Sequence, residues 1–157
     1  MGEYKGYLVQ PKDVHRIWGH VEPLIQIALD SIDENEKAHY LVTDDFREWF
    51  HDTMAQLFII TKDKEIKLVA VTEIGNHGGR HKLLHCMLIG GTGLFECYGE
   101  LQRVTEEFAV REGCVRMVIH ARKGMQKYLE NMMWEEVKTK HKIIMMKNIG
   151  DWATNPY

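Results

Sequence analysis

The chain has 157 residues, the size of one domain, and its 45% hydrophobic and 27% charged residues are typical of a water-soluble globular protein. A formal net charge of −3 argues against nonspecific binding of nucleic acid, and no apolar run is long enough to cross a membrane. The amino terminus carries no secretory signal pattern, and Cys86, Cys97 and Cys114 have no CxxC spacing. We therefore expect a cytoplasmic protein with free thiols.

The first third of the chain predicts a strand followed by a helical region. A strand at residues 4–9 precedes apolar residues that recur at helical spacing from Val14 to Leu29. Pro23 lies inside this pattern and removes a backbone donor, so we expect either a kink or two helices that meet near residues 19–22.

A second helix and three strands follow. Thr43 or Asp44 is a suitable helix cap, and the inner face of that helix would hold Phe46, Trp49, Phe50 and Met54. Polar turns at residues 62–65 and 76–79 separate strands at residues 56–61, 66–74 and 82–89. These three strands predict an antiparallel meander.

The second half of the chain alternates helices and strands. Gly90–Gly93 leads into a helix that ends at Gly113, with an apolar face of Leu94, Tyr98, Leu101, Thr105 and Phe108. The pattern continues with a strand at 115–120 and a short helix over 125–132. It ends with strands near 136–138 and 141–149 and an irregular tail at 149–157. The order β-αα-βββ-α-β-α-ββ predicts one mixed α/β domain over residues 1–157.

The glycine-rich stretch Gly90-Gly91-Thr92-Gly93 has two interpretations. Backbone N–H groups and the dipole at the start of a helix attract anions, and glycine lets a phosphate approach closely. The same residues also suit a turn between a strand and a helix, with no ligand at all.

The order of elements resembles the GNAT superfamily of acyl-CoA-dependent N-acetyltransferases over nearly the whole chain. In that family a Gln/Arg-x-x-Gly-x-Gly/Ala loop after the fourth strand holds the pyrophosphate of coenzyme A. Residues 89–95 take that position here without the Gln or Arg. The family's second motif is matched in spacing over residues 122–134, with Trp134 at its aromatic position and Tyr128 one residue before its tyrosine position.

Three short motifs are similar to a divergent GNAT branch that tailed bacteriophages encode: Ile89-Gly90-Gly91, Gly113-Cys114 and Arg122-Lys123-Gly124. The resemblance implies an α/β (α+β) GNAT-like fold, with a mixed, mostly antiparallel sheet flanked by helices on both faces. The fourth and fifth strands of that fold splay apart to accept the pantetheine arm of the cofactor.

The implied activity is transfer of an acetyl group from acetyl-CoA to the amine of a small molecule or protein. The cofactor would contact Leu88, Ile89, Gly90, Gly91, Thr92, Gly93, Arg122 and Lys123. Tyr128 would protonate the departing thiolate, as the family's tyrosine does, and His85 would serve as general base. The carboxylate of Glu73, at the expected end of its strand, is a second candidate for the general base.

Each candidate has a structural alternative. His85 also fits a core histidine, and Glu73, Arg122 and Lys123 also fit a solvated surface. Cys97, in the first turn of a helix, is either a thiol of lowered pKa or a buried helix-face thiol. His81 and His85 share a strand face roughly 13 Å apart, too far for one ion, so no metal site is expected.

The competing function is a catalytically inactive phage protein that keeps the scaffold and acts through contacts with a virion or host protein. Such a protein would lie in the host cytoplasm or in the virion. Neither function calls for nucleic acid or a membrane. The sequence leaves open whether the chain is an enzyme, which amine it would use, and whether it forms a homo-oligomer.

Overall fold

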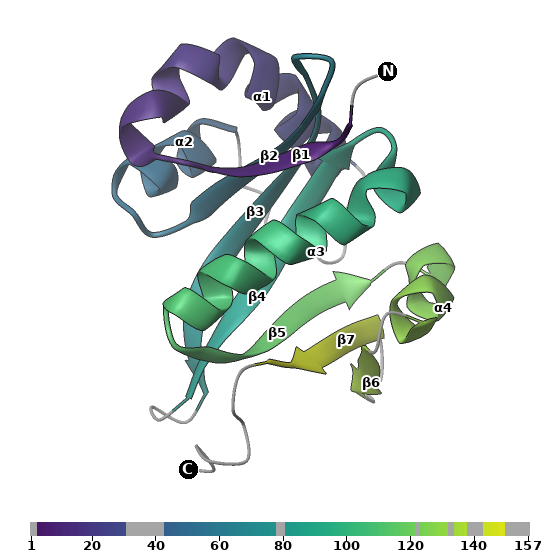
Figure 1. The fold of residues 1–157 in the computed structure, drawn as a ribbon. Helices are drawn as coiled ribbons and strands as arrows, with labels where there is room; N and C mark the ends of the chain where they lie inside the picture. The colour runs from purple at the N-terminus through teal and green to yellow at the C-terminus, as the bar shows by residue number, and fades with distance from the viewer. Residues whose placement is uncertain are drawn as a thin grey trace. The chain divides into compact units, whose positions relative to one another are not determined.

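A computed structural model describes residues 3–30, 43–77, 81–121, 123–131, 134–137 and 143–149 (Figure 1). The hydrogen-bonded strand order is β1-β2-β3-β4-β5-β7-β6. The pairing of β4 (His81–Gly91) with β5 (Cys114–Ala121) is parallel. The pairings β1–β2, β2–β3, β5–β7 and β6–β7 are antiparallel. The predicted fold class is confirmed: a mixed α/β fold with a seven-stranded, mostly antiparallel sheet and four α-helices among the described residues.

The chain forms two compact units. Unit 1 comprises residues 1–72 and 88–105, and unit 2 comprises residues 73–87 and 106–157. Strands β3 (Glu65–His77) and β4 and helix α3 (Leu94–Arg111) contribute residues to both units. The single domain over residues 1–157 stays a prediction.

Unit 1 begins with β1 (Lys5–Val9), the 3-10 turn η1 (Pro11–Asp13) and α1 (Val14–Asp30). Helix α1 runs through Pro23 without interruption, so the alternative of two helices is wrong, and the kink stays a prediction. Proline removes one helical hydrogen bond, but the buried face remains in phase on both sides of it. That face holds Trp18, Val21, Ile25, Ala28 and Leu29.

Helix α2 (Thr43–His51) covers the same core as α1 in unit 1. Phe46 and Phe50 are buried, and the Phe50 ring meets the edge of Trp18 at a centroid distance of 6.5 Å. Met54 was expected on this face but is 65% exposed. The helix ends at His51, so the helical period that placed Met54 inward no longer applies.

Strands β2 (Gln56–Lys62) and β3 form a tight hairpin, as the sequence predicts. Asp63 and Lys64 have φ values of 53° and 67°, so both central residues of the turn are left-handed. A two-residue turn of this kind matches the right-handed twist of the strands it joins. Lys67 Nζ donates to Glu65 Oε2 over 2.6 Å beside the turn.

Unit 2 is built on β5, β7 (Ile143–Asn148), β6 (Glu135–Val137) and α4 (Lys123–Asn131). The β4–β5 register runs from Lys82–Cys114 to Cys86–Ile119, and β6 and β7 add antiparallel strands. The core comprises Leu84, Met117, Ile119, Leu129, Trp134 and Met145. Gly113 (φ +81°) ends α3, as predicted. The expected turn at Gly78–Gly79, strand residues 138 and 141–142, and the tail from 150 onward lie outside the described residues.

Gly90 allows α1 to pack directly on β4 within unit 1. A Cβ atom at this position would overlap the carbonyl oxygen of Leu24 and lie 3.0 Å from Cβ of Ala28. At the next residue, Gly91, φ is +130° and a Cβ would overlap the carbonyl oxygen of Lys67 in β3. Both obstacles are backbone atoms, so side-chain rotation cannot relieve them.

We therefore expect Gly90→Ala to lower the free energy of unfolding by about 2–4 kcal/mol, because α1 must move away from β4. Gly99→Ala is a matched control, since nothing lies within 4 Å of its Cβ position in α3. That control should raise stability by about 0.5–1 kcal/mol through helix propensity. Urea unfolding measures both, and equal stabilities of the two variants would contradict the packing argument.

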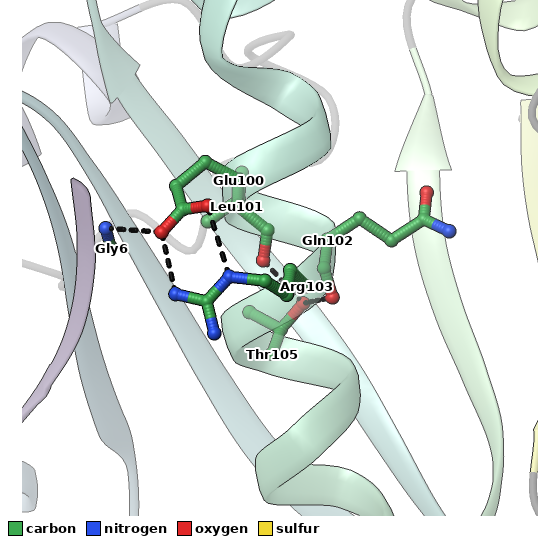
Figure 2. Close-up of polar contacts among 6 residues, drawn as sticks. All are labelled: Gly6, Glu100, Leu101, Gln102, Arg103 and Thr105. Atoms are coloured by element: carbon green, nitrogen blue, oxygen red, sulfur yellow. Dashed lines mark hydrogen bonds and ion pairs between the residues drawn. The ribbon is translucent and has the colours of Figure 1, made fainter. Parts of the chain in front are cut away.

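Glu100 ties α3 to β1 within unit 1 (Figure 2). The N–H of Gly6 donates to Glu100 Oε1 over 2.9 Å, and a Cβ at Gly6 would lie 2.9 Å from Val104 Cγ1. Arg103 donates to both oxygens of the same carboxylate, over 3.0 Å and 2.5 Å. The hydrogen bond from Arg103 and the amide of Gly6 keep the pKa of Glu100 below its ordinary value, although burial opposes them.

A lowered folded-state pKa means that this contribution is complete above the ordinary glutamate pKa of about 4.3 and is lost as the pH falls below it. Glu100→Gln should therefore cost about 1 kcal/mol at pH 7, because the ion pair is lost while Gly6 keeps an acceptor. Urea unfolding of both proteins between pH 7 and pH 3 should show the difference shrinking toward acid. A difference that stays constant over this range would refute the assignment.

Candidate functional site

The junction between β4 and α3 differs from the expected four-residue loop. Gly90 and Gly91 are the last residues of strand β4, and only Thr92 and Gly93 separate the strand from the helix. The reason is the close packing of Gly90 on α1 and of Gly91 on β3, which keeps both residues in the sheet. Leu88 is buried and Ile89 is half-buried in the same strand.

Gly93 is the N-cap of α3. Its carbonyl oxygen accepts the first helical hydrogen bond, from the N–H of Cys97 over 3.0 Å, and its φ is +74°. The N–H of Thr92 donates backward to the carbonyl of Lys67 in β3 over 2.9 Å. The amides of Gly93, Leu94 and Glu96 precede the first bond of the helix, so the helix itself supplies them with no acceptor. These amides are the part of the junction that suits an anion.

Two side chains lie beside Gly93. A Cβ atom there would be 3.1 Å from the Tyr4 hydroxyl oxygen and 3.5 Å from Glu96 Oε2. The ammonium of Lys62 lies 4.9 Å from the centroid of the Tyr4 ring. The Glu96 carboxylate therefore occupies the region near the helix start that a phosphate would use, where the dipole favours either anion.

The sequence predicts neither Tyr4 nor Lys62 as a neighbour of this junction. Tyr4 precedes β1 and Lys62 ends β2, so only the antiparallel pairing of β1 with β2 brings them to one end of the sheet. Glu96, by contrast, can be placed near the junction from the sequence, because it lies in the first turn of the predicted helix.

Unit 2 brings together two residues that the sequence treats separately. His85 Nδ1 lies 3.1 Å from Glu73 Oε1, with side chains that are 26% and 46% exposed. His85 is therefore not enclosed in the core. The sequence predicts Glu73 at the end of its strand, but β3 continues beyond it to His77. Strand β4 lies next to β3 in the sheet, and Glu73 on β3 faces His85 on β4.

The remaining candidates lie in or beside α4. Tyr128 is half-buried in the middle of this helix, and Lys123 is its first residue. Met125 and Leu129, which flank Tyr128 on the helix, are buried. Arg122 lies outside the described residues.

The three cysteines are free, and two of them are buried. Burial raises the pKa of Cys97 to about 11, and it also raises the pKa of Cys114. Of the two interpretations of Cys97, the structure supports the buried helix-face thiol. Burial is the largest effect on its pKa, and the nearby charge of Glu96 raises it further, against one backbone hydrogen bond that lowers it.

Thiol reagents should therefore label the half-buried Cys86 first. At pH 7.5 the raised pKa alone should slow the reaction of Cys97 by about two orders of magnitude relative to an ordinary thiol. Iodoacetamide labelling followed by peptide mass spectrometry measures each rate. Rapid modification of Cys97 in the native protein would show that its thiol is not buried as described.

Among the residues that the structure describes, no helix is both long and apolar enough to cross a membrane. No family model matches the sequence, and no curated protein is significantly similar to it in sequence.

Solved structures, by contrast, match over almost the whole chain. FeeM, an N-acyl amino acid synthase from uncultured soil microbes, matches with a TM-score of 0.65 and 11% identity, over 99% of this chain and 96% of its own. yncA from Salmonella typhimurium, solved with its cofactor acetyl-CoA, gives a TM-score of 0.67 and 11% identity over 97% of both chains. An acetyltransferase of the GNAT family from Streptococcus pneumoniae gives 0.57 and 13%, over 94% of this chain and 100% of its own. The chain therefore has the GNAT fold.

Proposed function

We propose that this protein is an acetyl-CoA-dependent N-acetyltransferase. The observation that carries the proposal is the short passage from β4 into α3 at Gly93, where the amides of Gly93, Leu94 and Glu96 precede the first hydrogen bond of a long helix. A pyrophosphate bound there would receive hydrogen bonds from those amides and a favourable helix dipole. The GNAT fold supports this assignment, since yncA holds acetyl-CoA.

The cofactor contacts divide by chemistry. The amides of Gly93, Leu94 and Glu96 bind the pyrophosphate, and the Thr92 hydroxyl is a further donor. Gly90 and Gly91 act through shape, because the absence of side chains lets the end of β4 pack against α1 and β3. Leu88 and Ile89 would run beside the pantetheine arm. The resemblance to the GNAT family also makes Arg122 and Lys123 candidates for contacts with the cofactor.

The proposed reaction would have three proton transfers. His85 would take one proton from the acceptor ammonium, and the neutral amine nitrogen would attack the thioester carbonyl carbon. As the carbonyl reforms and the bond to sulfur breaks, Tyr128 would donate its phenolic proton to the departing thiolate. The nitrogen would then lose its second proton, through water, to the Tyr128 phenolate. The products are an N-acetyl amide and free coenzyme A. The acceptor is a small-molecule or protein amine.

The alternative function is a catalytically inactive GNAT-fold phage protein that acts through contacts with a virion or host protein. One observation weighs against cofactor binding without pointing to such a partner. The Glu96 carboxylate lies over the start of α3, where it repels a phosphate and already benefits from the helix dipole. Under the proposed function this carboxylate turns away when the cofactor binds, and its charge weakens binding.

Calorimetric titration with acetyl-CoA tests the proposal. We expect saturable one-to-one binding that Glu96→Gln tightens about five-fold, since one like charge some 4–6 Å away costs about 1 kcal/mol in a water-like medium. Glu107→Gln, a change of the same charge on the exposed face of α3, should leave the affinity unchanged. Release of free coenzyme A in the presence of amines then tests turnover.

Substitutions at Gly91 cannot test cofactor binding, because any side chain at this position overlaps the backbone of β3 and would disturb the fold. If neither the wild type nor Glu96→Gln binds acetyl-CoA at millimolar concentration, the enzymatic proposal fails. The scaffold alternative would in addition require co-purification with a virion or host protein.

A further inference from the structure

The pair formed by Glu73 and His85 has a chemical consequence for the imidazole ring. An ionised carboxylate can only accept hydrogen bonds, so the 3.1 Å contact requires a proton on His85 Nδ1. In the neutral ring this proton leaves Nε2 as the basic nitrogen. Free histidine side chains prefer the opposite tautomer, with the proton on Nε2, so the carboxylate has to reverse the intrinsic preference.

The strands fix the geometry of this pair. Glu73 and His85 lie in β3 and β4, and Gly75 faces Leu83 on the same pair of strands, with its Cβ position 3.5 Å from Leu83 Cδ1. The shared register holds both side chains on one face of the hairpin. With 26% of the His85 side chain and 46% of the Glu73 side chain exposed, both reach solvent, as a base that accepts protons from substrate must.

We propose that Glu73 is a positioning residue for acetyl transfer: it fixes His85 in the Nδ1–H tautomer, so that Nε2 takes the proton of an acceptor that arrives as an ammonium ion. This inference rests on the proposed function. As His85 becomes an imidazolium ion, the Glu73 carboxylate stabilises the new positive charge. The negative charge of Glu73 also favours approach of a cationic amine over that of a neutral or anionic acceptor.

Nitrogen NMR of His85 tests the tautomer without any cofactor. At a pH well above the ordinary histidine pKa of about 6.5, the wild type should show a protonated Nδ1 and an unprotonated Nε2. Glu73→Ala should return the ring to the Nε2–H tautomer. A wild-type ring protonated on Nε2 would overturn the proposal whatever the activity.

Steady-state kinetics test the consequence for turnover. Glu73→Ala should lower kcat by about 10- to 100-fold, at the lower end of what general base catalysis contributes, and leave the KM for acetyl-CoA unchanged. Glu106→Gln is the matched control, because it breaks another part-exposed pair in unit 2, with Lys147 at 3.2 Å, and should change neither constant.

The outcomes separate the two proposals. Turnover by the wild type that Glu73→Ala leaves unchanged overturns the positioning role alone. Absence of acetyl-CoA binding and of turnover with every amine tried overturns the proposed function, and the positioning role with it.

Discussion

The close approach of helix α1 to strand β4 at Gly90 is the constraint on which the candidate cofactor site depends. The carbonyl of Leu24 occupies the space that any side chain at Gly90 would need, and Gly91 meets β3 in the same way. These contacts hold the end of β4 in the sheet, so the chain must turn into α3 within two residues. Farther along α3, the Glu100 carboxylate accepts a hydrogen bond from Gly6 and so links the helix to β1, near the amino terminus. These contacts place the first residues of α3 directly after the end of β4.

The glycines therefore serve the fold first and a ligand only indirectly. A motif of glycines after a strand suggests a flexible cradle around a phosphate, but Gly90 and Gly91 are enclosed by backbone, and the Thr92 amide is engaged by Lys67. An anion could therefore bind only at the start of the helix, where the Glu96 carboxylate lies close by and would compete with it. Under the proposed function, this balance between the helix dipole and one carboxylate would set the affinity for the pyrophosphate.

The order of elements was predictable because it depends on local periodicity. The apolar stripe of α1, the paired apolar and polar residues of the hairpins and the stop at Gly113 are all readable within a few residues. The sequence was a poor guide where residues far apart in the chain determine the local structure. Gly90 stays in the strand because of a helix some 60 residues earlier, and Gly6 meets Glu100 across 94 positions. The pairing of Glu73 with His85 had a usable signal, since both lie six positions from Gly79 in a hairpin, but the register of a glycine-rich turn is weakly specified.

The central claim is that the start of α3 binds the pyrophosphate of acetyl-CoA. The most direct measurement is an amide-resolved NMR titration of the full chain with acetyl-CoA. The account predicts saturable shifts of the amides of Gly93, Leu94 and Glu96, with the same dissociation constant at each and with smaller shifts for coenzyme A fragments that lack the pyrophosphate. Saturation of other amides while these three stay unmoved, or no shift at millimolar acetyl-CoA, would contradict it.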